Sequence, residues 1–227
     1  MAMTLGAVTF DEAYTTAQET YDEVGGRDER VITLSGLILG ETTVVGVEAR
    51  LDAVLDAASD ADYAELSVRD GRVMQVRRES FKRTLNRAEK TGSFELVLAA
   101  RDPYEYAETE TTVSWPVSAS GVTLLVSPGG NVYAQPAIAL SASGTVVAPT
   151  FSDGTRSIGY TGSVADGSAL LFDAAAGTVV LDGADVTPYC VGDFPRLDPG
   201  GTTLTYTDDT ASSHTASVTV KYRDRWW

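Results

Sequence analysis

The second half of the sequence is a series of short alternating segments separated by turn-forming residues about every 8–12 positions, and this spacing constrains the fold more than any other feature. The turns contain Gly, Pro, Asn or Asp: Ser127–Asn131, Ser143-Gly144, Asp153-Gly154, Asp166-Gly167, Ala176-Gly177 and Asp182-Gly183. Apolar residues in this half show no helical periodicity. Short antiparallel strands bury their apolar faces by stacking in two layers, so the spacing predicts a β-sandwich or jelly roll.

The first half contains one amphipathic helix. Its apolar residues fall on a single helical face: Val47, Leu51, Val54, Leu55 and Ala58. Thr42 or Thr43 can cap the start of the helix, and Ser59-Asp60 ends it. Polar side chains fill the opposite face, as expected for a helix that lies on a sheet: Glu48, Arg50, Asp52 and Asp56.

The remainder of the first half is predicted to form strands. The clearest segments are Arg30–Ile38, Tyr63–Val68, Arg72–Val76 and Phe94–Ala100. The middle two flank Asp70-Gly71, which is a strong hairpin signal. Residues 1–29 are expected to be irregular, with one strand around Ala7–Phe10 and a turn at Gly25-Gly26. Arg77–Lys90 is expected to continue the preceding strand and then to form an exposed loop.

Composition changes near residue 115. Thr109–Trp115 still alternates, whereas Pro116–Gly121 has the small and polar residues of a linker. We therefore predict an N-terminal β domain with one amphipathic helix over residues 1–115 and a C-terminal β-sandwich over residues 116–227. The 227 residues, of which 43% are hydrophobic, are enough for two domains with cores of their own, and the expected fold class is mainly β.

Charge is distributed unevenly along the sequence. The net charge is −15, which argues against nucleic acids and anionic membranes as partners. Nine of the 17 basic residues nevertheless lie between Arg69 and Arg101. This cluster is either a solvated face of a strand pair or a contact with the acidic face of another subunit. The candidate contact residues are Arg72, Arg77, Arg78, Lys82, Arg83 and Arg87.

The sequence offers no clear metal, cofactor or catalytic site. His214 is the only histidine and lies in a polar turn beside Ser212 and Ser213, an arrangement that gives no preorganised triad. Cys190 is the only cysteine, which excludes an intrachain disulfide and a cysteine-cluster metal site, and a buried, inert thiol is expected. We therefore expect no enzyme and no cofactor.

Membrane and export signals are missing from the sequence. No apolar run is long enough to span a bilayer, and the first residues lack the basic start and apolar core of a signal peptide. We expect the chain to be made and folded in a cytoplasm, without a membrane as partner.

In their order and spacing these segments resemble the distal tail proteins of long-tailed, siphovirus-like phages and archaeal viruses. The resembling parts of the first half are Arg30–Ile38, Val44–Ala58, Leu66–Val76, Phe94–Ala100 and Asp102-Pro103-Tyr104. Those of the second half are Gly130–Ile138, Ile158–Tyr160, Asp166–Leu170, Val180–Gly183, Phe194–Gly200 and Val218–Arg223. The resemblance covers nearly the whole chain.

This resemblance implies a tail-tube-like β-sandwich with one helix, followed by a galectin-like or jelly-roll β-sandwich. It implies a structural virion protein of the tail tip, assembled in the host cytoplasm, six copies of which form a ring that joins the tail tube to the baseplate and receptor-binding apparatus. The implied partners are other copies of the chain, the tail tube protein, and tail-tip hub, tape-measure or receptor-binding proteins. The basic cluster is then a candidate subunit or tube interface, and Trp226 and Trp227 are candidate contacts with a partner or the other domain.

A carbohydrate-binding β-sandwich that attaches to host surface glycans is the alternative function, because exposed aromatic rings can stack on sugars. The candidates are Tyr133, Tyr160, Tyr189, Tyr206, Trp226 and Trp227. Tyr206 lies in an alternating strand, where packing in the core is the competing interpretation. An accessory domain of a secreted glycosidase is a third reading, against which the missing signal peptide weighs.

Overall fold

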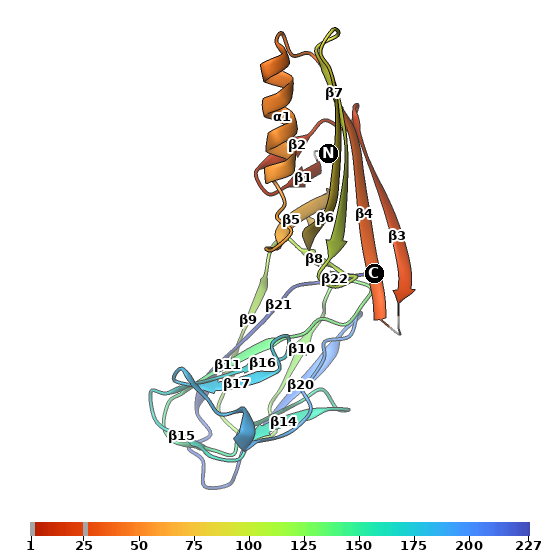
Figure 1. Cartoon of the computed structure of the whole chain (residues 1–227). Helices are drawn as coiled ribbons and strands as arrows, with labels where there is room; N and C mark the ends of the chain where they lie inside the picture. The colour runs from red at the N-terminus through yellow and green to blue at the C-terminus, as the bar shows by residue number, and fades with distance from the viewer. Residues whose placement is uncertain (1–2, 25–26) are drawn as a thin grey trace. The chain divides into compact units, whose positions relative to one another are not determined.

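The computed structural model describes residues 3–24 and 27–227, and it divides into two compact units (Figure 1). The first unit is Met1–Glu108 with Trp227, and the second is Thr109–Trp226. The boundary that the sequence placed after residue 115 falls within strand β9 (Thr111–Val117), which pairs with strand β21 (Ala216–Tyr222) of the second unit. Alternation identifies a strand but not the sheet that it joins, so the sequence assigned this strand to the first domain.

The first unit is built on one antiparallel sheet whose strands follow the order β2-β1-β5-β6-β7-β4-β3. Strand β8 pairs with β6 beside this path. The elements are β1 (Met3–Leu5), β2 (Val8–Phe10), β3 (Thr15–Val24), β4 (Arg27–Ile38), α1 (Val44–Asp56), β5 (Ala64–Arg69), β6 (Arg72–Asn86), β7 (Thr91–Ala100) and β8 (Glu105–Ala107).

Helix α1 lies against the middle of this sheet, as the sequence predicted (Figure 1). Thr43 is the N-cap, and its hydroxyl oxygen accepts a 3.0 Å hydrogen bond from the backbone N–H of Gly46. The buried face of the helix joins a core with the inward side chains of β4 and β7. Gly92 on β7 permits the close approach, because a Cβ atom there would lie 2.9 Å from Val47 Cγ1 and 3.0 Å from Leu51 Cδ1.

The first 29 residues contain more regular structure than the sequence indicated. The expected strand near Ala7–Phe10 is β2, but β1 precedes it and β3 follows it, so the prediction of an irregular segment was wrong. Strand β3 pairs along its length with β4 and lies at the end of the sheet order. Its inward positions include the polar residues Thr15 and Glu19, so apolar alternation does not reveal it. The turn predicted at Gly25-Gly26 lies outside the described residues.

A β-bulge divides strand β6 into two halves. Arg78 lies opposite Leu98 and Ser80 lies opposite Val97, so Glu79 is an extra residue in the strand. Before the bulge the even-numbered residues share the face of α1; after it the odd-numbered residues do, among them Phe81. The strand continues to Asn86, so most of the segment expected as an exposed loop is paired sheet.

The second unit is a β-sandwich, as predicted. One sheet has the order β10-β20-β13-β14-β19 and the other β18-β17-β16-β11-β21-β9, with β12 and β15 as a separate pair. The further elements are β10 (Thr123–Val126), β11 (Ala137–Ala142), β12 (Val146–Val147), β13 (Thr150–Ser152), β14 (Ser157–Tyr160), β15 (Ser163–Val164), β16 (Ala169–Asp173), β17 (Thr178–Leu181), β18 (Ala184–Asp185), η1 (Thr187–Tyr189), β19 (Cys190–Gly192), β20 (Thr202–Thr207) and β22 (Arg225–Trp226).

The core of the sandwich is centred on Phe151. This side chain is fully buried, and its ring centroid lies 6.0 Å from that of Trp115, 5.4 Å from that of Phe172 and 5.5 Å from that of Tyr206. The four rings come from strands of both sheets, so they hold the two layers together.

Candidate functional site

The basic cluster predicted from the sequence lies on β6 and the turn after it, and three of its side chains contact α1 or the end of α1. Arg78 Nη1 donates a 2.7 Å hydrogen bond to the backbone oxygen of Leu55. Arg83 forms an ion pair with Asp52, and Arg87 Nη2 lies 3.0 Å from Glu48 Oε1. The bulge is what turns both Arg78 and Arg83 toward the helix, because they lie on opposite sides of it and differ in parity.

The other three cations of the cluster also have acidic partners. The nitrogen–oxygen distances are 3.3 Å for Arg72–Glu105, 3.4 Å for Arg77–Glu79 and 2.7 Å for Lys82–Glu95. The partner of Lys82 lies directly opposite it on β7, on the face of the sheet away from α1. The cluster is therefore a set of ion pairs rather than an uncompensated basic patch.

Sequence reasoning located the cations but did not pair them with their carboxylates. The polar face of α1 indicated two of these partners, because it carries both Glu48 and Asp52. The outer cations remain accessible, since the side chains of Lys82 and Arg87 are 76% and 72% exposed. The side chain of Arg78 is the most buried of the six, and its hydrogen bond to Leu55 connects β6 to α1 within the first unit.

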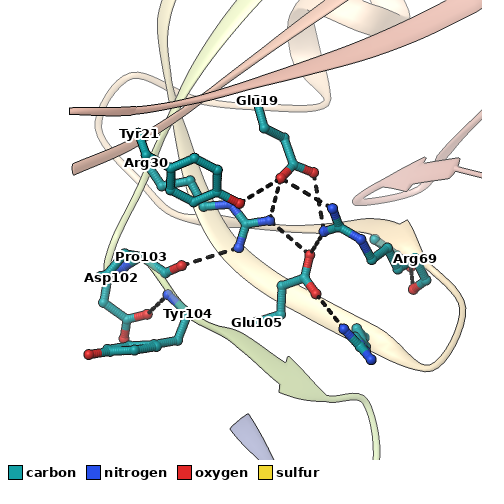
Figure 2. A network of polar contacts seen from close by, with 10 residues as sticks. Glu19, Tyr21, Arg30, Arg69, Asp102, Pro103, Tyr104 and Glu105 are labelled. Atoms are coloured by element: carbon teal, nitrogen blue, oxygen red, sulfur yellow. Dashed lines mark hydrogen bonds and ion pairs between the residues drawn. The ribbon is translucent and has the colours of Figure 1, made fainter. Parts of the chain in front are cut away.

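A buried polar network lies at the other end of the sheet, and the sequence did not reveal it (Figure 2). Arg30 is 1% exposed and donates through Nη2 to Glu19 at 2.7 Å and to Glu105 at 2.9 Å, and through Nη1 to the backbone oxygen of Pro103 at 3.1 Å. Arg69 also contacts both carboxylates. The network joins the consecutive strands β3 and β4 to β5 and β8, which come much later in the sequence.

Glu19 is the carboxylate of this network whose ionised form is favoured. Burial opposes ionisation of Glu19, but hydrogen bonds from Tyr21 and Arg30 and the nearby positive charges outweigh it, so the pKa of Glu19 is lowered. Burial and the bond to Glu19 raise the pKa of the Tyr21 hydroxyl. Burial alone would lower the pKa of Arg69, but the charges of Glu105 and Glu19 raise it.

The stability of the first unit is expected to depend on pH through Glu19. Because its folded pKa lies below the ordinary value of 4.5, its charge stabilises the fold fully above that value and ceases to do so as the pH falls through the folded pKa. Unfolding midpoints measured between about pH 7 and pH 3 should fall at the acid end, and Glu19→Gln should make that fall smaller. An identical acid-dependent loss in the variant and the parent chain would contradict this assignment.

The two tryptophans predicted as contacts lie in different surroundings. Trp226 is half-buried in β22. Trp227 is 49% exposed, and its ring centroid lies 6.0 Å from that of Tyr21 in a stacked arrangement and 5.5 Å from that of Tyr104 edge-on. The three rings form an aromatic cluster beside the buried network, because Tyr21 is also a member of that network.

His214, Tyr206 and Cys190 each have a local structural explanation. His214 Nδ1 lies 2.8 Å from Asp208 Oδ1, and the same carboxylate accepts a hydrogen bond from the hydroxyl of Tyr206. Tyr206 is fully buried, so core packing is the interpretation that holds for it. Cys190 is half-buried instead of fully buried, and burial raises the pKa of its thiol.

The described part of the chain comprises residues 3–24 and 27–227. That part of the chain holds no group of three or more His, Cys, Asp and Glu side chains arranged to bind a metal. It also contains no helix with the length and apolar character needed to cross a membrane.

Together the two units define a mainly β protein in which a sheet carrying one helix precedes a β-sandwich. Residues 129–226 match the family model described as the siphovirus-type tail component, C-terminal domain. The sandwich of this chain is thus similar to the C-terminal domain of a siphovirus tail component.

The whole chain resembles a solved tail protein. Its fold matches the crystal structure of Dit (gp 19.1) of phage SPP1 with a TM-score of 0.71 and 14% sequence identity, over 100% of this chain and 99% of that one. That protein is described as a paradigm of the hub adsorption apparatus in phages that infect Gram-positive bacteria. A search of curated proteins found no significant match. The resemblance to distal tail proteins and the mainly β fold class inferred from the sequence are confirmed.

Proposed function

We propose that this chain is a structural protein of the tail tip of a long-tailed virus and that six copies form a ring. The ring would join the tail tube to the baseplate and receptor-binding apparatus, through contacts with the tube protein on one side and with hub, tape-measure or receptor-binding proteins on the other. The protein would be assembled in the host cytoplasm and retained in the virion. Its role would be mechanical rather than catalytic.

The observation that carries this proposal is the agreement of two independent comparisons. The family match covers the sandwich, and the fold match extends over both units with nearly complete coverage of each chain. A ring has a physical rationale as well, because a head-to-tail interface closes on itself and leaves no exposed sheet edges.

The proposal is tested by the mass and shape of the purified chain. We expect native mass measurements to detect six copies and negative-stain images to show six-fold rings, either for the chain alone or with the tail tube protein from the same viral genome. A chain that stays monomeric at high concentration and also in the presence of that tube protein would contradict the proposal.

We further propose that the basic cluster contributes to the subunit or tube contact. Arg77, Lys82, Arg83 and Arg87 have exposed side chains whose intrachain ion pairs contribute little to stability, so they can exchange partners when an acidic surface approaches. The second unit supplies such a surface, since only three basic residues occur between residues 102 and 222, which are Arg156, Arg196 and Lys221. Arg72 and Arg78 would support this contact by fixing β6.

Reversing the charge of Lys82 should weaken assembly. Lys82→Glu places a carboxylate opposite Glu95 and in front of an acidic neighbour, so we expect the concentration needed for half-assembly to rise about tenfold or more. Arg50→Glu is the matched control, because Arg50 is also exposed and paired with an acid, Glu41, but lies on α1. Equal effects of the two variants, measured by mass photometry, would argue against a specific role for β6.

Trp226 and Trp227 remain proposed contacts with a partner. The exposed half of Trp227 and the adjoining ring of Tyr21, which is 45% exposed, provide an aromatic surface of the kind that anchors protein interfaces. Trp227→Ala is the variant with which to examine this surface in the assembly assay above.

A further inference from the structure

The sandwich contains a polar pocket that the proposed tail role does not use. Its volume is about 370 Å³, which lies within the usual range of small-molecule sites. The lining comes from four separate segments of the second unit: Gln135, Arg156, Ala174 and Asp193–Arg196. Two of the three basic residues between positions 102 and 222 therefore meet in one pocket of an otherwise acidic region.

Asp153 holds these two arginines side by side. Its Oδ1 accepts hydrogen bonds from the backbone N–H groups of Thr155 at 2.8 Å and Arg156 at 2.6 Å, and its Oδ2 accepts from the N–H of Arg196 at 2.9 Å. Burial opposes ionisation of Asp153, but these N–H groups outweigh it and lower its pKa. The turn between β13 and β14 is thereby fixed to the segment that contains Arg196.

The other walls are fixed by backbone contacts. Ala134 and Leu197 exchange two hydrogen bonds of 2.8 and 3.0 Å, which places their chain neighbours Gln135 and Arg196 at the pocket. The guanidinium of Arg196 lies 4.2 Å from the ring centroid of Tyr133 and is supported by that ring. The pocket is therefore a built arrangement, held by interactions that leave its polar groups available.

Three polar groups in the lining have no hydrogen-bond partner among the residues that the structure describes. Among residues 3–24 and 27–227, no hydrogen bond is made by the guanidinium of Arg196, the side-chain amide of Gln135 or the carboxylate of Asp193. Among the same described residues, the guanidinium of Arg156 makes only one hydrogen bond, a long contact of 3.5 Å with Asp153. The set combines cationic donors, an anionic acceptor and an amide that can do both.

This combination selects for a particular ligand chemistry. A bare phosphate or sulfate would satisfy the arginines but would be repelled by Asp193, whereas a neutral sugar would leave the guanidinium charges without an anion. A sugar acid satisfies both, because its carboxylate accepts from the arginines and its hydroxyls donate to Asp193. The apolar surfaces of Phe194 and Pro195 can pack against the C–H face of the ring.

We propose that this pocket binds an acidic saccharide, such as a hexuronic acid residue of a surface polysaccharide, with Arg156 and Arg196 at the carboxylate and Asp193 and Gln135 at the hydroxyls. Binding at this pocket goes beyond the hub role and does not depend on ring formation. It gives the alternative function, glycan binding, a specific location. None of the aromatic residues suggested by the sequence lines this pocket, and Tyr133 participates only by supporting Arg196.

The test is a titration of the full chain monitored by NMR and calorimetry. It uses four kinds of probe: the hexuronates glucuronate, galacturonate and mannuronate; glucose; acetate; and inorganic phosphate. We expect at least one hexuronate to bind about tenfold or more tightly than glucose, acetate or phosphate. Equal affinity for acetate or phosphate would show a simple anion site and overturn the proposal. No binding of any hexuronate up to ~50 mM would overturn it as well.

Variants separate the pocket from a general charge effect. Arg196→Gln should weaken hexuronate binding about tenfold or more, whereas Lys221→Gln, which removes the same charge outside the pocket, should leave it unchanged. Asp193→Ala should weaken hexuronate binding without weakening acetate binding, because it removes only the acceptor for hydroxyls. Since Asp193 is exposed, this variant should fold normally, and hexuronate binding unaffected by either pocket variant would overturn the proposal.

Discussion

Replacing Glu105 with glutamine is expected to lower the free energy of unfolding of the first unit by about 3–5 kcal/mol, the range found when one partner of a buried ion pair is removed. Glu105 is 2% exposed and contacts three arginines, of which Arg30 is itself fully enclosed. The variant keeps the size of the side chain but leaves the charge of Arg30 with Glu19 as its one remaining carboxylate in the network.

The effect should be measured by hydrogen exchange under increasing denaturant, because this method follows the peptides of β3, β4 and β8 separately from the sandwich. Glu95→Gln is the matched control: Glu95 is also paired with a cation, Lys82, but both side chains are substantially exposed, and the change in stability should be much smaller. Similar losses of unfolding free energy in the two variants would mean that the buried ion pairs of the network contribute no more to stability than an exposed pair.

Phe151→Ala is expected to destabilise the second unit by about 3–5 kcal/mol, because removing a buried phenylalanine loses its transfer free energy and leaves a cavity. Phe151 is fully buried and contacts the rings of Trp115, Phe172 and Tyr206. Since Trp115 lies beside the new cavity, denaturant unfolding followed by tryptophan fluorescence should report the change.

The matched control for this variant is Leu125→Ala. Leu125 is an apolar residue of the same unit but is 68% exposed, so its truncation should have a small effect. An equally small effect of Phe151→Ala would mean that the four rings are not the centre of the sandwich core.

Much of the fold could be predicted because its signals are local. The cap at Thr43, the helical face of α1 and the Asp70-Gly71 hairpin each depend on residues close together in the sequence. Strand β3 could not be found in this way, since its inward positions include Thr15 and Glu19 and therefore lack the apolar alternation on which the prediction rests. The sheet joined by β9 depends on a partner about a hundred residues away.

The candidate sites were less predictable, because they depend on tertiary pairing. Arg30 shares its parity with Ile32 and Leu34, both of which point into the core, and a charged residue at an inward position is the signal of a buried network. Its partners Glu19 and Glu105 come from other strands, and the sequence around them does not indicate that they pair with Arg30. The pocket had one signal as well, the scarcity of basic residues around Arg156 and Arg196.

The bulge at Glu79 makes the length of β6 as important as its composition. If the strand paired regularly through this point, with Glu79 retained and placed opposite Val97, the two faces of everything beyond it would be exchanged. Phe81 and Leu85 would then turn to solvent, and Lys82 and Thr84 would be driven under the helix. The strand thus has a reading frame of side chains that its one extra residue resets, and deleting Glu79 would remove the bulge while leaving Phe81 and Leu85 on the face of the helix.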